Sequence, residues 1–121
     1  MIGAIEASRD HIAELCRFYG VRRLEVFGSA ATDAFDPQRS DVDFLIEFDE
    51  SGDRDLFRRY FGLKEALEQL LGRSVDLVMA GALTNRYFID AVNKSRQLVY
   101  AAQSAKLLED IRAVRPHRAS R

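Results

Sequence analysis

The chain has 121 residues, 47% of them hydrophobic, and a formal net charge of −1. A chain of this size forms one domain with a substantial core, and its near-neutral charge argues against direct nucleic-acid binding. It contains no apolar run long enough to span a membrane and no apolar segment after a basic start, so we expect neither a membrane span nor a secretion signal. The single cysteine, Cys16, excludes an internal disulfide, and together these features predict a cytoplasmic protein.

Charge is distributed unevenly along the chain. Residues 33–55 contain nine acidic and two basic residues, a local charge of −7, whereas five bases and two acids from residue 106 onward give +3. An acidic block attracts cations, and a basic tail either binds an anionic surface or stays in water. We therefore expect one domain over residues 1–112, followed by a basic tail over residues 113–121.

The first half of the chain predicts a helix and two strands. Apolar residues at helical spacing favour a helix over residues 4–19, ended by Gly20. The segment "VRRLEVFG" is typical of a short strand, broken by Gly28-Ser29 with one helical turn after it. "DVDFLIEF", residues 41–48, is the second predicted strand.

The second half continues the alternation of helices and strands. Apolar residues three and four apart predict a helix from Leu56, closed by Gly72, and then a strand in "SVDLVMA". "LTNRYFIDAVNKS" favours a helix capped by Thr84 or Asn85, followed by a strand in "RQLVYAA" and a last helix. This order predicts an α/β (α+β) fold, with a small mixed sheet flanked by helices and covered mainly on one side.

Two aspartates interrupt the otherwise apolar second strand. Period-two alternation places Asp41 and Asp43 on one face, about 6.5–7 Å apart at their Cα atoms. Without a cation such a pair repels, whereas a metal can be held between the two carboxylates. Asp76 interrupts the third strand in the same way, and three oxygen ligands with open positions fit Mg²⁺.

Gly28-Ser29 supplies the features of a phosphate site. A glycine after a strand lets the backbone approach a phosphate closely, and the serine hydroxyl adds a donor. Combined with metal-holding aspartates, this pattern indicates nucleotidyl transfer, in which an acceptor hydroxyl attacks the α-phosphorus and pyrophosphate leaves. Each feature alone is weak, but their order along the chain is far more specific.

The segments "FGSAATDAFDPQRSDVDFLIEF" and "SVDLVM" resemble the minimal nucleotidyltransferases of the DNA polymerase β superfamily. The chain is most similar to the short MNT antitoxins paired with HEPN ribonuclease toxins, over about residues 24–101. The resemblance implies that Gly28 and Ser29 bind the triphosphate. It also implies that three aspartates hold Mg²⁺: Asp41, Asp43 and Asp76. The family's reaction moves AMP from ATP to a tyrosine of the toxin, which implies a HEPN toxin as partner in a hetero-oligomer.

One departure from the family pattern concerns the residues after Gly-Ser. The family usually has a small residue and then Ala-Arg-Gly, whereas this chain continues with Ala30, Ala31, Thr32 and Asp33. A basic side chain near the triphosphate is therefore missing from its expected position. Arg39, just before the acidic pair, is the candidate substitute for nucleotide binding.

Three functions remain open on the sequence. The first is Mg²⁺- and ATP-dependent adenylylation of a toxin, favoured because so short a chain leaves the acceptor side of its cleft open to another subunit. The second is a non-catalytic antitoxin that neutralises the toxin by binding, which the missing arginine favours and the three aspartates oppose. The third is nucleotidylation of a small molecule such as an aminoglycoside.

Overall fold

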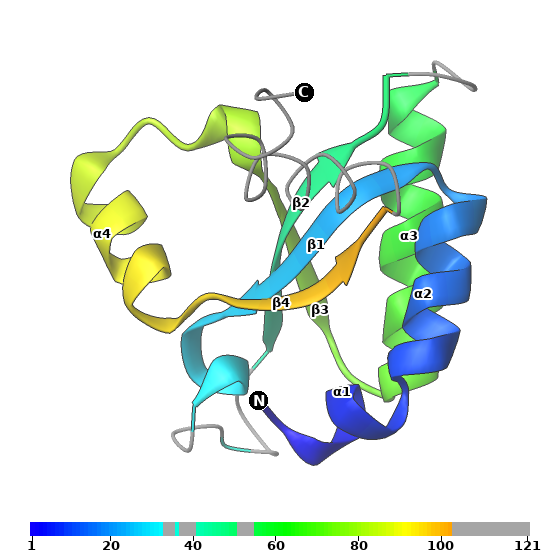
Figure 1. Cartoon of the computed structure of the whole chain (residues 1–121), viewed down its shortest axis with the longest axis horizontal. Coiled ribbons are helices and arrows are strands. Elements are labelled where there is room, and N and C mark those ends of the chain that lie inside the picture. Colours follow the sequence, from blue (N-terminus) through cyan, green and yellow to red (C-terminus); the bar gives the residue numbers. More distant parts are fainter. Residues whose placement is uncertain (33–35, 37–40, 51–54, 103–121) are drawn as a thin grey trace, which may run out of the picture.

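A computed structural model describes residues 1–32, 36, 41–50 and 55–102. Figure 1 shows a four-stranded sheet with the helices α2 and α3 together on one side and α4 apart from them. The elements in chain order are α1 (Gly3–Ala7), α2 (Arg9–Phe18), β1 (Val21–Phe27), the 3₁₀ helix η1 (Gly28–Ala31), β2 (Val42–Phe48), α3 (Leu56–Leu71), β3 (Val75–Met79), the 3₁₀ helix η2 (Ala80–Ala82), α4 (Arg86–Ser95) and β4 (Gln97–Ala101). Arg39, the expected last helix and the basic tail lie outside the described residues.

The sheet is mixed, as predicted. Its strand order is β3-β2-β1-β4. The β1 strand runs antiparallel to β2 and β4, whereas β2 and β3 are parallel. A parallel pair needs a crossover, and here α3 provides it. The crossover returns β3 to the side of β2 in the same direction, so both strands begin at the same end of the sheet.

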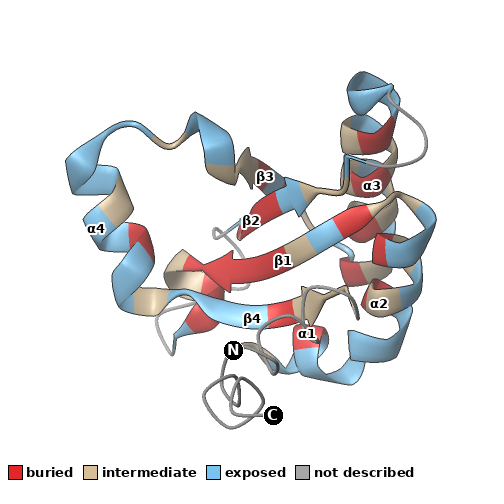
Figure 2. Cartoon of the chain, turned by 45° about the horizontal axis from the view of Figure 1, so that its top comes forward, coloured by how far each residue is buried: buried red, intermediate tan, exposed pale blue. Residues whose placement is uncertain are grey.

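The two faces of the sheet differ in how much they bury. The main core lies on the face covered by α2 and α3, and it includes Leu24, Val26 and Phe44. A smaller cluster of Phe27, Leu45 and Val92 lies on the opposite face, where α4 packs. Figure 2 shows much of β1 as buried, because residues on its two faces belong to the two clusters. The predicted alternation of faces is therefore confirmed, and the sheet is covered mainly on one side.

The first predicted helix is two helices. The structure breaks it at Ser8, whose N–H donates to the carbonyl of Ile5 and whose carbonyl accepts from Ile12. Serine has a lower helix propensity than alanine or leucine, so a break at this position costs little, and its side chain makes no capping hydrogen bond to α2 here. The prediction of one continuous helix over residues 4–19 was wrong for this reason. Cys16 is fully buried in the core, and that burial raises the pKa of its thiol to about 12.

The helix ends agree with the residues that predicted them. Gly20 follows α2 with φ +71°, and Gly72 caps α3 with φ +68°, a region that glycine enters without strain. The side chain of Asn85 accepts from the N–H of Phe88 and so caps α4. No helix in the described part of the chain combines the length and apolar character needed to cross a membrane.

The buried Arg59 of α3 donates hydrogen bonds to three backbone carbonyl groups outside its own helix. It donates to Tyr19 O at 2.9 Å, to Gly20 O at 2.6 Å and to Asp49 O at 2.7 Å. Its guanidinium also lies 4.8 Å from the ring centre of Phe48. A buried cation needs such a set of partners. Arg59 therefore ties α3 to the end of α2 and to the end of β2.

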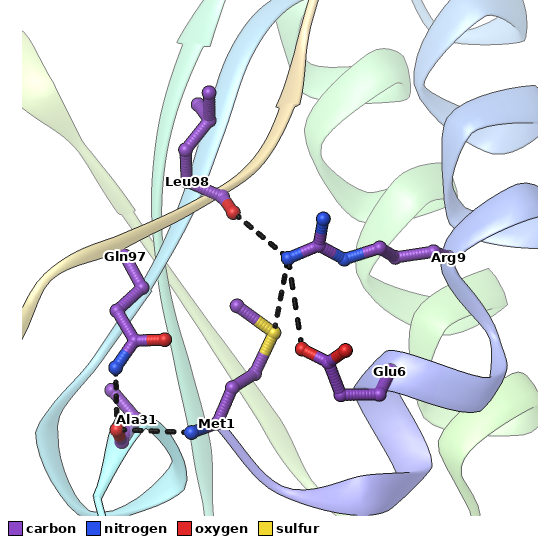
Figure 3. A network of polar contacts seen from close by, with 6 residues as sticks. All are labelled: Met1, Glu6, Arg9, Ala31, Gln97 and Leu98. Atoms are coloured by element: carbon purple, nitrogen blue, oxygen red, sulfur yellow. Dashed lines mark hydrogen bonds and ion pairs between the residues drawn. The ribbon is translucent and has the colours of Figure 1, made fainter.

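Side chains from the helices also occupy backbone groups of both outer strands. On β3, Glu68 Oε2 accepts from Val75 N at 3.1 Å, and Tyr60 Oη donates to Leu77 O at 2.6 Å. On β4, Arg9 donates to Leu98 O at 3.3 Å, as Figure 3 shows. Outer strands carry backbone groups that need partners, and here α2 and α3 supply some of them.

Gly62 provides a test of how closely α2 packs on α3. A Cβ at this position would lie 2.5 Å from Cε1 of Tyr19. Alanine in place of a helix-interior glycine ordinarily stabilises by about 0.5–1 kcal/mol, whereas overpacking costs about 1–3 kcal/mol. We expect Gly62→Ala to lower the free energy of unfolding by about 1–2 kcal/mol, measured by urea denaturation.

The matched background is Tyr19→Ala, which removes the ring that the new methyl group meets. In that background Gly62→Ala should stabilise the protein, because only the helix preference of alanine remains. The same loss in both backgrounds would show that the contact with Tyr19 is not the cause.

Candidate functional site

The parallel pairing of β2 and β3 brings two of the predicted aspartates together. Asp43 is the register partner of Asp76, and neighbouring strands are about 4.8 Å apart. Both follow the alternation that places Leu45 and Val78 in the smaller cluster, on the sheet face opposite the main core. Two carboxyl groups from strands 33 positions apart in the chain thus lie side by side.

Burial and like charge both act on the Asp43 carboxyl of this pair. Asp43 is half-buried, and burial raises the pKa of its carboxyl above the ordinary value. The negative charges of Asp76 and then of Asp41 raise this pKa further. Low dielectric and like charges both disfavour the ionised form. A cation or a proton bound at Asp43 would reduce both the cost of burying its charge and the repulsion from Asp76 and Asp41.

Asp41 lies just before β2 and is exposed. Within the described ranges, no three His, Cys, Asp or Glu side chains are grouped closely enough to hold a metal ion by themselves. Mg²⁺ does not require such a cage, because it usually keeps several waters and binds one or two carboxylates plus substrate phosphates. The oxygen ligands of Asp43 and Asp76 fit that mode of binding.

The Gly28-Ser29 bend lies directly beside Asp43. Phe27, the last residue of β1, is the register partner of Asp43, so the bend begins one residue later. Gly28 has φ +69°, and a Cβ there would lie 3.0 Å from Asp43 Oδ2. The position therefore requires glycine for its backbone conformation, and a Cβ there would also crowd the carboxylate. The expected helical turn is present as η1, and it begins at Gly28 and so includes the bend itself.

Two side-chain contacts at this end of the sheet were missed from the sequence. Ser95 Oγ accepts from Gly28 N at 2.9 Å, across 67 positions of the chain. Arg96 donates to Glu25 through Nε at 3.0 Å and Nη2 at 2.5 Å. Glu25 offered a signal, since it is an acidic residue between Leu24 and Val26 in an apolar strand. Ser95 offered none, because nothing in its neighbourhood marks it.

The ion pair with Arg96 keeps the buried carboxyl of Glu25 ionised. Burial acts to raise the pKa of the Glu25 carboxyl, but the hydrogen bonds and charge of Arg96, together with Arg23, hold this pKa below its usual range. A paired buried carboxylate of this kind is structural rather than reactive. It fastens the end of α4 to β1 three residues before Gly28.

Comparisons with known proteins identify the family of the chain. The family model described as "Nucleotidyltransferase domain" matches residues 8–104. The chain is 36% identical over 92 residues to protein adenylyltransferase MJ0128 of Methanocaldococcus jannaschii, covering 76% of this chain and 88% of the relative. A solved structure described as a minimal nucleotidyltransferase has a TM-score of 0.61 and 33% identity, over 76% of this chain and 89% of that one.

A third likeness is to a chain in the complex of a tri-AMPylated HEPN toxin from Shewanella oneidensis with an MNT antitoxin. The TM-score is 0.55 at 16% identity, over 95% of this chain and 87% of that one. At this identity the likeness shows the shared fold alone.

The repulsion at Asp43 predicts a gain in stability when its charge is removed. The pKa of Asp43 is higher in the folded protein than its ordinary value of 3.8, so ionisation costs stability as pH rises above 3.8 and through the folded pKa. At pH 7 in a chelator, Asp43→Asn should raise the free energy of unfolding by about 0.2–1 kcal/mol. The measurement is a pair of thermal melts.

The gain should shrink as the pH is lowered through the raised pKa of folded Asp43, because the wild-type carboxyl then takes up a proton as well. Asp10→Asn on α2 is the matched control and should show no such gain. Equal melting temperatures for wild type and Asp43→Asn at pH 7 would contradict a repulsive pair.

Proposed function

Because the chain belongs to the nucleotidyltransferase domain family, we propose that it transfers AMP from ATP to a hydroxyl group of a partner protein. The acceptor we propose is a tyrosine of a HEPN ribonuclease toxin, which makes this chain the antitoxin of the pair. The observation that carries the proposal is the Asp43–Asp76 pair beside the Gly28-Ser29 bend.

The relatives support the choice of acceptor class. The relative from Methanocaldococcus jannaschii carries the name of a protein adenylyltransferase, and the complex from Shewanella oneidensis joins an MNT antitoxin to an AMPylated HEPN toxin. Asp41 and Asp76 are exposed, so a bulky acceptor can reach the carboxylates.

Two surface pockets of the described residues, of about 540 and 560 Å³, are lined by none of the proposed site residues.

The proposed site holds Mg²⁺ through Asp43 and Asp76, with Asp41 as a further ligand. When bound, the metal neutralises phosphate charge and lowers the pKa of the acceptor hydroxyl. Gly28 leaves room for the triphosphate, and Ser29 donates its hydroxyl to a phosphate oxygen. Arg39 is proposed as the cation that offsets the remaining phosphate charge, in place of the missing family arginine.

The chemical step is a displacement at the α-phosphorus of ATP. The acceptor oxygen forms a bond to this phosphorus as the bond to the bridging oxygen breaks. Pyrophosphate leaves with the electron pair of the broken bond, and the hydroxyl proton passes to a site carboxylate or to water. Adenylylation converts the tyrosine hydroxyl into a negatively charged AMP phosphodiester, and this change would silence the toxin.

A second candidate is inhibition of the toxin by binding alone. The observation that favours it is Thr32-Asp33 at the position where the family has a base. A single experiment separates the two functions, because only the first places a nucleotide on the partner.

Incubation of the chain and its toxin partner with α-labelled ATP and Mg²⁺ should label the partner. Asp41→Asn and Asp43→Asn should each lower the label at least about 100-fold, the usual cost of losing transition-state charge stabilisation. Asp10→Asn on α2 changes charge equally and should leave labelling unchanged. Full inhibition of the toxin by both variants, with no label from the wild type, would establish binding alone.

Mg²⁺ and ATP together should raise the melting temperature of the isolated chain. A ligand at 100 times its Kd stabilises the folded state by about 2.7 kcal/mol. Asp76→Ala should abolish most of this increase, whereas the exposed Glu65→Gln on α3 should retain it. A wild-type melting curve that does not respond to Mg²⁺ and ATP would contradict the proposed site.

A further inference from the structure

The backbone of the Gly28-Ser29 bend needs an external constraint. Glycine enters positive and negative φ almost equally well, so the φ of +69° at Gly28 is not set by the residue itself. A bend with several accessible conformations would have to be ordered each time a triphosphate binds. The free energy spent on this ordering would weaken binding. The N-terminus constrains the far end of the bend, where Met1 N donates to Ala31 O at 3.1 Å and Ile2 N to Ala30 O at 2.9 Å. The junction of α4 and β4 constrains Gly28 itself.

Three consecutive residues at the junction of α4 and β4 contact the bend or the strand before it. Ser95 Oγ accepts from Gly28 N at 2.9 Å, and Gln97 Nε2 donates to Ala31 O at 2.9 Å. These two bonds reach the first and last residues of η1, and Figure 3 shows the second of them. The bend is thus held at both of its ends by the same short segment.

The residue between them fixes that segment to the sheet. Arg96 binds the buried Glu25 of β1 through two nitrogens and also donates through Nη1 to Asn93 Oδ1 at 2.7 Å. A bidentate pair with a buried carboxylate is geometrically specific. The hydroxyl of Ser95 is therefore presented to Gly28 from a rigid support, and its position does not depend on the bend.

We propose that Ser95 is a positioning residue of the nucleotide site. Its oxygen directs the Gly28 amide away from the triphosphate and fixes the bend in the conformation in which Ser29 and the following amides receive phosphate. The proposal deepens the proposed function and rests on it for the identity of the ligand. The hydrogen bond itself exists whether or not the chain transfers AMP.

The test compares Ser95→Ala with Ser95→Thr, which keeps a hydroxyl oxygen on the same carbon. Ser8→Ala is the matched control, because it removes a serine hydroxyl at the junction of α1 and α2, on the other side of the sheet. Two readouts are used: amide hydrogen exchange of Gly28 without nucleotide, and the KM for ATP against kcat in AMP transfer.

In Ser95→Ala we expect exchange at Gly28 and the KM for ATP each to rise about tenfold, the effect of one lost hydrogen bond to a partly buried donor. Because the chemical groups remain, kcat should change less than about threefold. Ser95→Thr should restore both quantities to within about threefold of wild type, and Ser8→Ala should alter neither.

Unchanged exchange at Gly28 in Ser95→Ala would overturn the proposal. The proposal would also be overturned if Ser95→Thr raised the Gly28 exchange and the KM for ATP as much as Ser95→Ala does. Side-chain packing, and not the hydroxyl oxygen, would then be responsible. If the wild type transfers no AMP, the proposed function fails, but faster exchange at Gly28 in Ser95→Ala still supports Ser95 as the residue that fixes the bend. The two failures are therefore distinguishable.

Discussion

The repulsion between two neighbouring carboxylates is the constraint around which this end of the molecule is organised. A parallel register places Asp43 beside Asp76, and half-burial of Asp43 makes its charge harder to maintain. Apolar residues at these two positions would give a more stable sheet. The fold instead keeps the pair at the start of both strands, where Asp76 is open to solvent. Under the proposed function, the same two negative charges would attract a divalent cation that arrives with phosphate.

Much of the fold follows from local pattern. Period-two alternation assigned the faces of three strands, because the pattern depends only on which residues are apolar. Gly20 and Gly72 marked helix ends because few other residues adopt a positive φ without strain. The pairing of Asp43 with Asp76 was also accessible, since an acidic residue in each of two apolar strands is a rare arrangement that suggests a common site.

The contacts between separate elements were not accessible from the sequence. Arg59 lies on the predicted apolar side of α3, and only the folded chain shows the three carbonyl groups that surround it. Ser95 and Gly28 are 67 positions apart, and neither a spacing nor a composition rule connects them. Ser8 divides a helix that periodicity alone describes as continuous. Periodicity reports which face a residue occupies, whereas these interactions depend on how separate elements meet.

The side chains along the outer strands have a consequence for how another protein can bind. A sheet can be extended by a strand from a partner only if the backbone groups on its border are available. Tyr60 and Glu68 already bind Leu77 and Val75 on one border, and Arg9 binds Leu98 on the other. Joining the two proteins through a continuous sheet would first require breaking these bonds. A partner protein that binds through side-chain surfaces would leave these bonds intact, so its specificity could change by surface substitution while the sheet beneath stays the same.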